Sequence, residues 1–97
     1  MHASVRKYKV DEEQIEELSR RIEDAFVPRL SGIPGFGGYY VVDATHGIVI
    51  TVTLGEDAAA VERSTELATE FVRDELTDLE IERIEAAHGE VLVERTG

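Results

Sequence analysis

The apolar residues in the middle of the chain predict a β-hairpin that is apolar on both faces. Its first strand follows the turn Pro34–Gly38 and runs from Tyr39 to Val42, and its second strand runs from Ile48 to Leu54. Side chains alternate between the faces of a strand, so a strand with one covered face needs an apolar residue only at every second position. This hairpin needs a cover on each face, and the sequence supplies helices for only one. We expect a partner on the other face, most simply a second copy of the chain.

An amphipathic helix is predicted before the hairpin, beginning at Asp11 or Glu12. Gln14 follows Asp11 at the spacing of a capping box. The apolar residues recur at offsets of three and four and form one stripe: Ile15, Leu18, Ile22, Ala25, Phe26 and Leu30. Pro28 lacks an N–H group, so the helix is expected to be kinked or to end there.

Two further strands and a second helix complete the predicted elements. Residues Ser4–Val10 indicate a first strand. The second helix is expected from about residue 57 to about residue 78, with boundaries uncertain by a few residues. A charged connection over Leu79–Ala87 then leads to a short last strand over Gly89–Arg95.

This order of strand, helix, strand, strand, helix, strand predicts a ferredoxin-like α+β fold. Its common compact form is a four-stranded antiparallel sheet in spatial order 4-1-3-2, with both helices on one face. The third strand carries two alternating sets of side chains. We expect the all-aliphatic set to meet the helices: Ile48, Ile50, Val52 and Leu54. The other set is expected on the uncovered face: Val49, Thr51 and Thr53.

The composition indicates one soluble domain spanning residues 1–97. A chain of 97 residues is of ordinary size for a single domain. It contains no cysteine, which excludes disulfides and thiolate metal sites. The apolar runs are too short to cross a membrane and the N-terminus lacks the layout of a signal peptide, so we expect a cytoplasmic protein without membrane contact.

The charge of the chain is strongly negative. There are 21 Asp and Glu residues against 10 Lys and Arg residues, giving a formal net charge of -11. Nucleic-acid binding is disfavoured because it requires clustered cations. Lys7 and Lys9 are the only lysines, and such an acidic, lysine-poor surface resembles that of halophilic proteins. The alternative is an ordinary acidic surface. The halophilic interpretation predicts that stability falls as salt is removed.

The sequence resembles the dimeric α+β barrel superfamily, and within it the antibiotic-biosynthesis-monooxygenase-like domains. The matching features are the Pro34–Phe36 turn leading into Tyr39 and Tyr40, the hairpin that ends in Glu56 and Asp57, the alanine-rich start of the second helix, and the entry into the last strand at residues 89–91. The resemblance implies a homodimer whose two sheets form a barrel, with a small-molecule pocket between each sheet and its helices. Members include cofactor-free oxygenases of aromatic polyketides and haem-degrading enzymes.

The catalytic residues of that family are not present. Its oxygenases and haem degraders use an asparagine and a tryptophan in the pocket, and the haem degraders add a histidine on the second helix. This chain has no asparagine and no tryptophan, and its second helix has no histidine. Leu54 and Gly55 occupy the place where relatives often carry a large aromatic residue. The fold is therefore expected without the known chemistry of the family.

Tyrosines and one arginine are the candidate ligand-binding residues of the sheet. Tyr39 and Tyr40 are adjacent, so one must face the helices and the other the opposite face. Either their hydroxyls lie at a rim of the packed core, or a phenol lines a pocket and binds an aromatic or carbonyl ligand. Arg6 and Tyr8 share one strand face and together suit an anionic oxygen, although a surface ion pair is the alternative for Arg6.

The three histidines do not predict a metal site. His46 is expected at the hairpin tip and His88 at the same end of the sheet, roughly 10–12 Å apart, with His2 at the opposite end. His88 is still a candidate for ligand binding, because Glu90 shares its strand face and is expected to orient it.

Three functions remain open from the sequence. The first is a homodimer that binds or oxidises a small aromatic or apolar molecule with Arg6, Tyr8, Tyr39, Tyr40 or His88, without a cofactor. The second is a non-catalytic small-molecule-binding module, and the third is a purely structural dimer. A pocket of several hundred cubic ångströms with inward tyrosine hydroxyls would favour a ligand. A cavity filled by phenylalanine and leucine side chains would argue against it.

Overall fold

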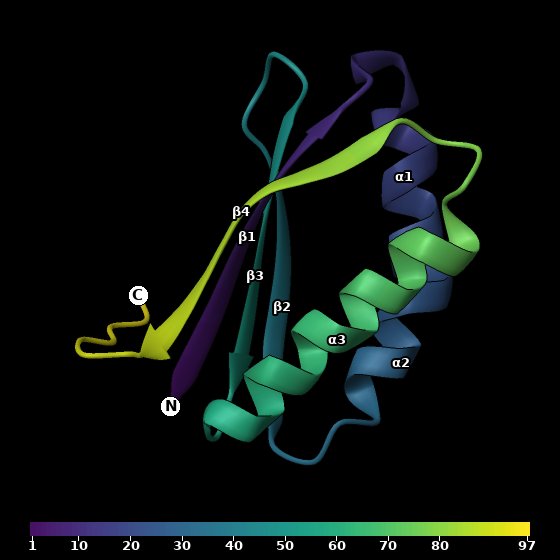
Figure 1. The fold of residues 1–97 in the computed structure, drawn as a ribbon. Coiled ribbons are helices and arrows are strands. Elements are labelled where there is room, and N and C mark those ends of the chain that lie inside the picture. Colours follow the sequence, from purple (N-terminus) through teal and green to yellow (C-terminus); the bar gives the residue numbers. More distant parts are fainter.

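The computed structural model describes all 97 residues, which form one antiparallel sheet with helices on a single face (Figure 1). The sheet order is β2-β3-β1-β4, which is the expected order 4-1-3-2 read from the other edge. The strands are β1 (His2–Val10), β2 (Phe36–Asp43), β3 (Ile48–Gly55) and β4 (Ile81–Glu90). The ferredoxin-like fold predicted from the sequence is confirmed. None of its helices has the length and apolar character needed to cross a membrane.

The first helical segment is continuous but changes its winding. It consists of a 3₁₀ turn η1 (Glu12–Gln14), α1 (Ile15–Arg21), a π-helical segment η2 (Ile22–Phe26) and α2 (Val27–Ser31). The Asp11 carboxylate caps it by accepting a hydrogen bond from the Glu13 N–H at 2.9 Å. Of the two outcomes predicted at Pro28, an end of the helix is excluded, because the helix continues to Ser31. Its winding changes to π-helical just before Pro28, as expected when a residue without an N–H group interrupts the regular hydrogen-bond pattern.

The second helix, α3 (Ala58–Glu75), begins close to the predicted residue. The Asp57 side chain accepts a hydrogen bond from the Ala60 N–H at 3.0 Å and caps the helix. Gly55 permits the close approach of α3 to the end of β3, because a Cβ atom there would lie 2.9 Å from the Cβ atom of Ala60.

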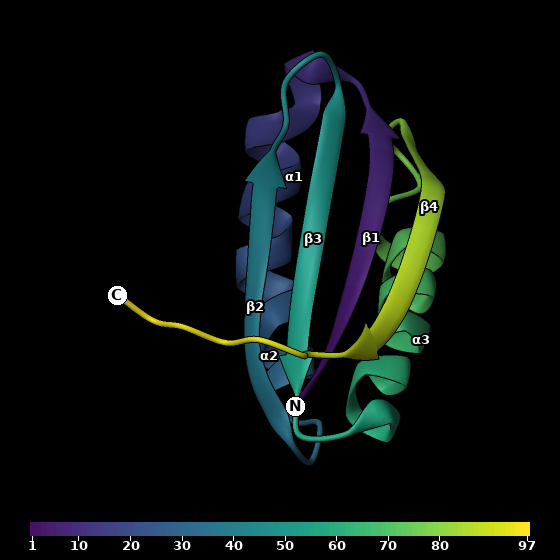
Figure 2. The ribbon, with the colours of Figure 1, turned by 90° about the vertical axis from the view of Figure 1, so that its left-hand side faces the viewer.

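The face of β3 that meets the helices is the reverse of the predicted one. Val49, Thr51 and Thr53 are buried under the helices, at 3%, 3% and 1% exposure. The aliphatic set lies on the face that no helix covers: Ile48, Ile50, Val52 and Leu54. The reason is chemical, because Arg6 of β1 lies on the helix-facing side and its guanidinium needs hydroxyl partners there. The open face, shown toward the viewer in Figure 2, is therefore more apolar than predicted.

The last strand begins eight residues earlier than predicted. Residues 81–90 form β4, which pairs with β1 along its whole length, whereas residues 91–97 lie outside any strand. The predicted charged connection is thus the strand itself. Its charged residues suit an edge strand, because exposed charge discourages further strand pairing. Residues 91–97 leave the end of β4 on the side of the open face (Figures 1 and 2).

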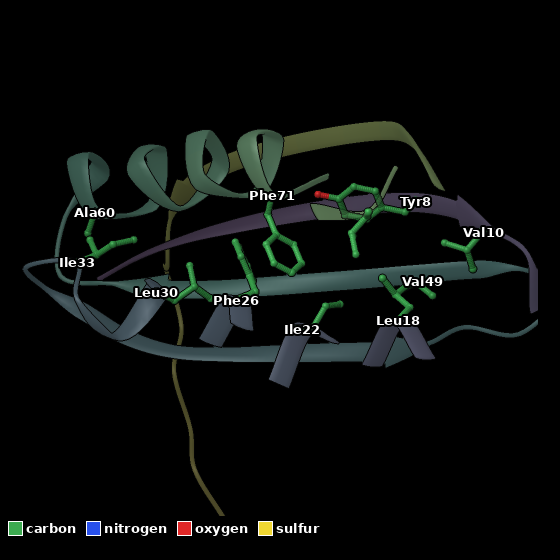
Figure 3. Packing of buried hydrophobic residues seen from close by; sticks show 12 residues of the cluster. Tyr8, Val10, Leu18, Ile22, Phe26, Leu30, Ile33, Val49, Ala60 and Phe71 are labelled. Atoms are coloured by element: carbon green, nitrogen blue, oxygen red, sulfur yellow. The ribbon is translucent and has the colours of Figure 1, made fainter. Parts of the chain in front are cut away.

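The core lies between the sheet and the two helical segments. Phe26 of η2 and Phe71 of α3 point toward each other at its centre, with ring centroids 5.1 Å apart (Figure 3). Leu18 and Leu30 extend the core along the first helical segment, and both are almost fully buried. These large side chains fill the space that the family resemblance assigned to a pocket.

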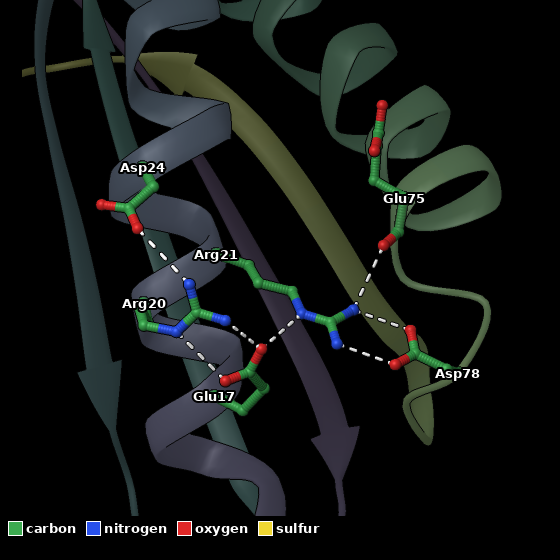
Figure 4. Close-up of polar contacts among 6 residues, drawn as sticks. All are labelled: Glu17, Arg20, Arg21, Asp24, Glu75 and Asp78. Atoms are coloured by element: carbon green, nitrogen blue, oxygen red, sulfur yellow. Dashed lines mark hydrogen bonds and ion pairs between the residues drawn. The ribbon is translucent and has the colours of Figure 1, made fainter.

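An ion-pair cluster joins the first helical segment to the end of α3 (Figure 4). Arg21 donates two hydrogen bonds to the Asp78 carboxylate, both of 2.7 Å, and a third to Glu17 at 2.8 Å. Glu17 also pairs with Arg20. The cluster fixes the position of α1 relative to α3 on the outer side of the core.

Candidate functional site

Arg6 is the most unusual residue of the helix-facing side, because its side chain is 0% exposed and has no charged partner. None of the ion pairs of the structure involves it. The predicted alternative of a surface ion pair is therefore wrong. A buried charge without a counter-charge is costly, and proteins usually neutralise or pair it.

Four hydroxyl groups surround the guanidinium. Its Nη1 atom donates to Ser4 Oγ, Ser64 Oγ and Thr65 Oγ1 at 3.3, 3.3 and 3.1 Å. Its Nη2 atom donates to Thr53 Oγ1 at 3.1 Å. These partners come from β1, β3 and α3, so the guanidinium ties the two central strands to the second helix.

The hydroxyls on α3 are oriented to accept. Ser64 Oγ and Thr65 Oγ1 donate to the carbonyl oxygen of Val61 at 2.6 and 3.3 Å. Their protons therefore point to the helix backbone and their lone pairs are left for Arg6. This arrangement distributes the positive charge among neutral dipoles without cancelling it.

Two buried polar atoms next to this network have no partner. They are Arg6 Nε and Thr51 Oγ1. Arg6 and Thr51 are paired across β1 and β3 and share the helix-facing side. Buried polar groups without a partner are rare in native structures, and each such group needs an explanation.

Tyr39 adds a third polar group to this region. Its ring packs edge-on against Phe26 with centroids 5.7 Å apart, which places it on the helix-facing side. Burial raises the pKa of Tyr39 to about 12, although the nearby Arg6 charge opposes this shift. The side chain is therefore a neutral phenol at physiological pH and does not act as a base.

Tyr8 shares the strand face of Arg6, as predicted, but its hydroxyl has a different partner. It accepts hydrogen bonds from Arg83 Nε at 3.3 Å and Nη2 at 3.1 Å, and the Arg83 guanidinium also lies 5.5 Å from the centre of the Tyr8 ring. Arg83 is held in turn by Thr69 Oγ1 at 2.9 Å. Arg6 and Tyr8 thus belong to two separate polar networks.

A cavity between the helices and the sheet measures about 30 Å³. Its lining includes Tyr8, Tyr39 and Thr51 on the sheet and Phe26 and Phe71 on the helices. An apolar cavity known to admit benzene measures about 150 Å³. The cavity therefore excludes an aromatic ring, and only a water-sized or monatomic occupant fits.

A larger groove of about 330 Å³ lies beside this cavity, between the first helical segment and strands β2 and β3. Leu18, Ile22, Tyr39 and Val49 line both spaces, so these side chains form the wall between them. The groove is mainly apolar and carries polar side chains as well: Ser19, Glu23, Tyr39 and Asp43. Its volume lies within the usual range for small-molecule sites.

The other candidates from the sequence lie elsewhere. Tyr40 is on the open face and is 60% exposed, so the prediction that Tyr39 and Tyr40 face opposite sides is confirmed. His88 is exposed on β4 opposite Ser4, at the end of the sheet that carries His2. Its predicted place at the same end of the sheet as His46 is wrong, because β4 begins earlier than expected. No group of three or more metal-ligating side chains is present.

Sequence reasoning missed most of the residues around Arg6. Ser64 and Thr65 come from α3, and nothing in helical periodicity marks a serine or threonine as a partner of a distant arginine. The sequence did contain one indication for Thr51 and Thr53, because they alternate on β3 as Arg6 and Tyr8 do on β1. The aliphatic set on the same strand is more apolar, so we expected that set to face the core instead.

No protein-family model matches the chain, and no curated protein matches it in sequence. Solved structures do match. The haem degrader MhuD from Mycobacterium tuberculosis, with two haems in its active site, gives a TM-score of 0.71 at 16% identity over 99% of this chain and 100% of that one. A monooxygenase from the gene ActVA-Orf6 of Streptomyces coelicolor, in complex with nanaomycin D, gives 0.67 at 18% identity over 96% and 92%. A dimeric ferredoxin-like protein from an uncultured marine organism gives 0.73 at 14% identity over 99% and 97%.

At 14–18% sequence identity, the structural similarity establishes the fold of the chain. The chain has the ferredoxin-like α+β fold of the antibiotic-biosynthesis-monooxygenase-like proteins and haem degraders, as the resemblance in sequence predicted.

Proposed function

We propose that the protein is a homodimer that binds a small apolar or aromatic molecule in the groove between the first helical segment and β2. The observation that supports this most directly is the groove of about 330 Å³, next to a core cavity that is too small for a ring. Apolar walls with a few polar groups are typical of ligand sites. Tyr39 lines both the groove and the cavity, so its side chain forms part of the wall that a ligand would contact.

The groove supports binding better than proton abstraction. Tyr39 has a pKa of about 12, so it does not accept a proton at neutral pH. His46 is at the hairpin tip and His88 lies on the far edge strand, so neither lines the groove. Glu23 and Asp43 do line it. Their negative charge favours a neutral or cationic group at that part of the groove.

The ligands of the structural neighbours are consistent with an aromatic occupant. MhuD is described with haem, and the ActVA-Orf6 monooxygenase with nanaomycin D. Haem and nanaomycin D are ligands of those two proteins. For this chain they support a search for a ligand among flat aromatic molecules.

The open face of the sheet supports the homodimer. Val5, Tyr40 and Val42 on this face are 42%, 60% and 47% exposed. Val52 lies between Val5 and Tyr40 in the strand pairing, and the rest of the β3 aliphatic set extends the patch. Contiguous apolar surface of this kind marks an interaction site. A second copy provides a complementary apolar surface, and one structural neighbour is described as dimeric.

Ligand binding is tested with 2-naphthol as the probe, followed by amide chemical shifts in high-salt buffer. We expect the largest shifts at Ser19 and Val41, which line the groove. A Ser19→Phe variant fills the groove and should abolish binding, whereas Ser31→Phe, the same change on the exposed end of α2, should not. Binding that persists in Ser19→Phe, or shifts confined to the open face, would contradict the proposed site. Conversion of the probe to an oxidised product would show that the groove is also catalytic.

A further inference from the structure

We propose that residues 91–97 form an arm that reaches the second copy of the chain, with Leu92 and Val93 packed against that partner. This assignment rests on the homodimer of the proposed function. It goes beyond the homodimer because it brings into the interface a segment that belongs to no strand or helix. The molecule that the arm contacts is a copy of this chain, so no further protein is needed.

Leu92 and Val93 are the most exposed large apolar residues of the protein, at 87% and 88%. The next most exposed is Tyr40 on the open face, at 60%. Single exposed apolar side chains are ordinary on protein surfaces. Here the two residues are adjacent and continue the aliphatic Val91, whereas solvated terminal segments are usually polar. Such a run is expected to bury its side chains against another surface.

The arm is held to its own chain only at its base. The Val91 N–H group donates a hydrogen bond to the Met1 carbonyl oxygen at 2.9 Å, which fixes the base of the arm beside the start of β1. Beyond Val91, no backbone hydrogen bond joins the arm to the rest of the chain. Leu92 and Val93 thus keep their apolar surface free for a second molecule.

The arm lies in front of the open face of the sheet. In Figure 1 the arm (yellow) is on the side of the sheet opposite the helices. In Figure 2 it crosses in front of β1, β3 and β2 close to the end of the sheet that carries the N-terminus. The two views agree that the arm extends into the space before the face that the second copy is proposed to cover. A copy seated on this face therefore meets the arm.

Charge and symmetry both favour this arrangement. The side chains of the arm include one acid and one base, Glu94 and Arg95, so they add no net charge, whereas the whole chain carries -11. The arm therefore approaches an acidic partner without the repulsion that opposes association of the rest of the surface. In a two-fold dimer each chain contributes one arm, so the apolar area that one arm buries is counted twice.

Two truncations test the contribution of the arm to the dimer. One ends after Val91 and so lacks Leu92 and Val93. It keeps the hydrogen bond from Val91 to Met1. The other ends after Arg95, keeps both aliphatic residues and is the control. Both variants should fold, because they leave β4 and its pairing with β1 intact.

The measurement is the rate at which subunits exchange between isotope-labelled and unlabelled dimers in concentrated ammonium acetate, followed by native mass spectrometry. We expect the truncation after Val91 to exchange faster than the wild type by about tenfold or more, because lost interface contacts act mainly on the dissociation rate. The truncation after Arg95 should exchange at the rate of the wild type. Equal rates for the wild type and both truncations overturn the proposal.

Direct contact is tested by isotope-filtered NOE spectra of a mixed sample of labelled and unlabelled chains, which detect contacts between copies only. We expect the methyl groups of Leu92 and Val93 to give such contacts. If the Val52 methyls on the open face give them and those of the arm contact only their own chain, the assignment of the arm is wrong and the homodimer stands. If no mixed dimer forms, the homodimer itself is contradicted and the arm proposal is overturned with it.

Discussion

Phe26 and Tyr39 decide, at the scale of single residues, how much space the helix-facing side of the sheet leaves. Phe26 is 2% exposed and contacts both Phe71 and Tyr39. It reaches this position from η2, a π-helical segment in which the backbone hydrogen bonds join residues five apart. Phe26 is therefore one of the large side chains that keep the core cavity small.

Replacing Phe26 with alanine should enlarge the cavity and destabilise the protein. We expect the free energy of unfolding to fall by about 3–5 kcal/mol, the usual cost for a buried phenylalanine. The measurement is urea denaturation in high salt. Phe36→Ala is the control, because Phe36 is only partly buried and should cost less. Equal losses for the two variants would show that Phe26 does not fill the core.

Tyr39 should ionise only at high pH. Burial raises its pKa in the folded state to about 12, above the ordinary value of 10.0. The neutral phenol is thus favoured by folding. Its stabilising contribution is complete below pH 10 and is lost as pH rises through about 12. In a spectrophotometric titration Tyr39→Phe should lack the late component, and Tyr40→Phe should retain it. A late component that survives in Tyr39→Phe would contradict this assignment.

The facing of β3 could not be predicted from hydrophobicity. Its two alternating sets are both compatible with a core, and the aliphatic set is the more apolar one. What decides the orientation is the buried Arg6 on the neighbouring strand, which requires Thr53 as an acceptor. Arg6 itself was predicted as a site residue and shares a strand face with Tyr8. Its hydroxyl partners on α3 depend on the packing of a distant helix, which the sequence does not encode locally.

At the scale of elements, the first helical segment is held in place by its contacts with α3. Arg21 bridges Glu17 on its own helix and Asp78 just beyond the end of α3. Arg29 adds a second link to Glu75 at 2.9 Å and lies 5.4 Å from the centre of the Phe71 ring. The same helical segment forms one wall of the groove.

The Arg21–Asp78 pair should make stability sensitive to acid. Hydrogen bonds from Arg21 hold the pKa of Asp78 at about 2, below the ordinary value of 3.8. The folded pKa is lowered, so the contribution is present above pH 4 and is lost as pH falls toward 2. Asp78→Asn should lower the melting temperature slightly at neutral pH and remove this acid-dependent step. Asp24→Asn, beside Arg20, is the control and should keep the step. An unchanged acid profile in Asp78→Asn would contradict the role of the pair.

Element order was predictable and element boundaries were less so. The caps at Asp11 and Asp57 marked both helix starts, because a capping side chain is a local signal. The start of β4 was missed because its many charged residues, taken by themselves, indicate a loop. Only the pairing with the neighbouring strand β1 shows that they form a strand. Pairing with β1 over residues 81–90 is a long-range effect, and it makes an edge strand of a segment with little apolar periodicity.

At the scale of the whole molecule, the distribution of apolar surface is one-sided. The helices cover one face of the sheet and no element covers the other (Figure 2). The aliphatic side chains of β3 lie on the open face and not, as was predicted, under the helices. The exposed apolar surface that a partner would cover is therefore larger than the sequence indicated. The net charge of -11 acts against association at low salt, because two such chains repel each other.

Salt should therefore stabilise both the fold and the dimer. The acidic, lysine-poor composition predicts a lower melting temperature as potassium chloride is reduced from molar to millimolar concentration. The effect is expected in potassium gluconate as well, because charge screening depends on ionic strength and not on which monovalent anion is present. A melting temperature that does not change with either salt would contradict the halophilic interpretation.

The most direct test of the account is the oligomeric state in high salt, measured by light scattering on a sizing column at micromolar concentration. We predict twice the 10.8 kDa mass of one chain for the wild type. Val52→Lys places a charge at the centre of the open face and should give a folded monomer, whereas Ala59→Lys, on the exposed side of α3, should remain dimeric. A wild-type protein that is monomeric and fully folded under these conditions would contradict the central claim that the open sheet face joins two copies.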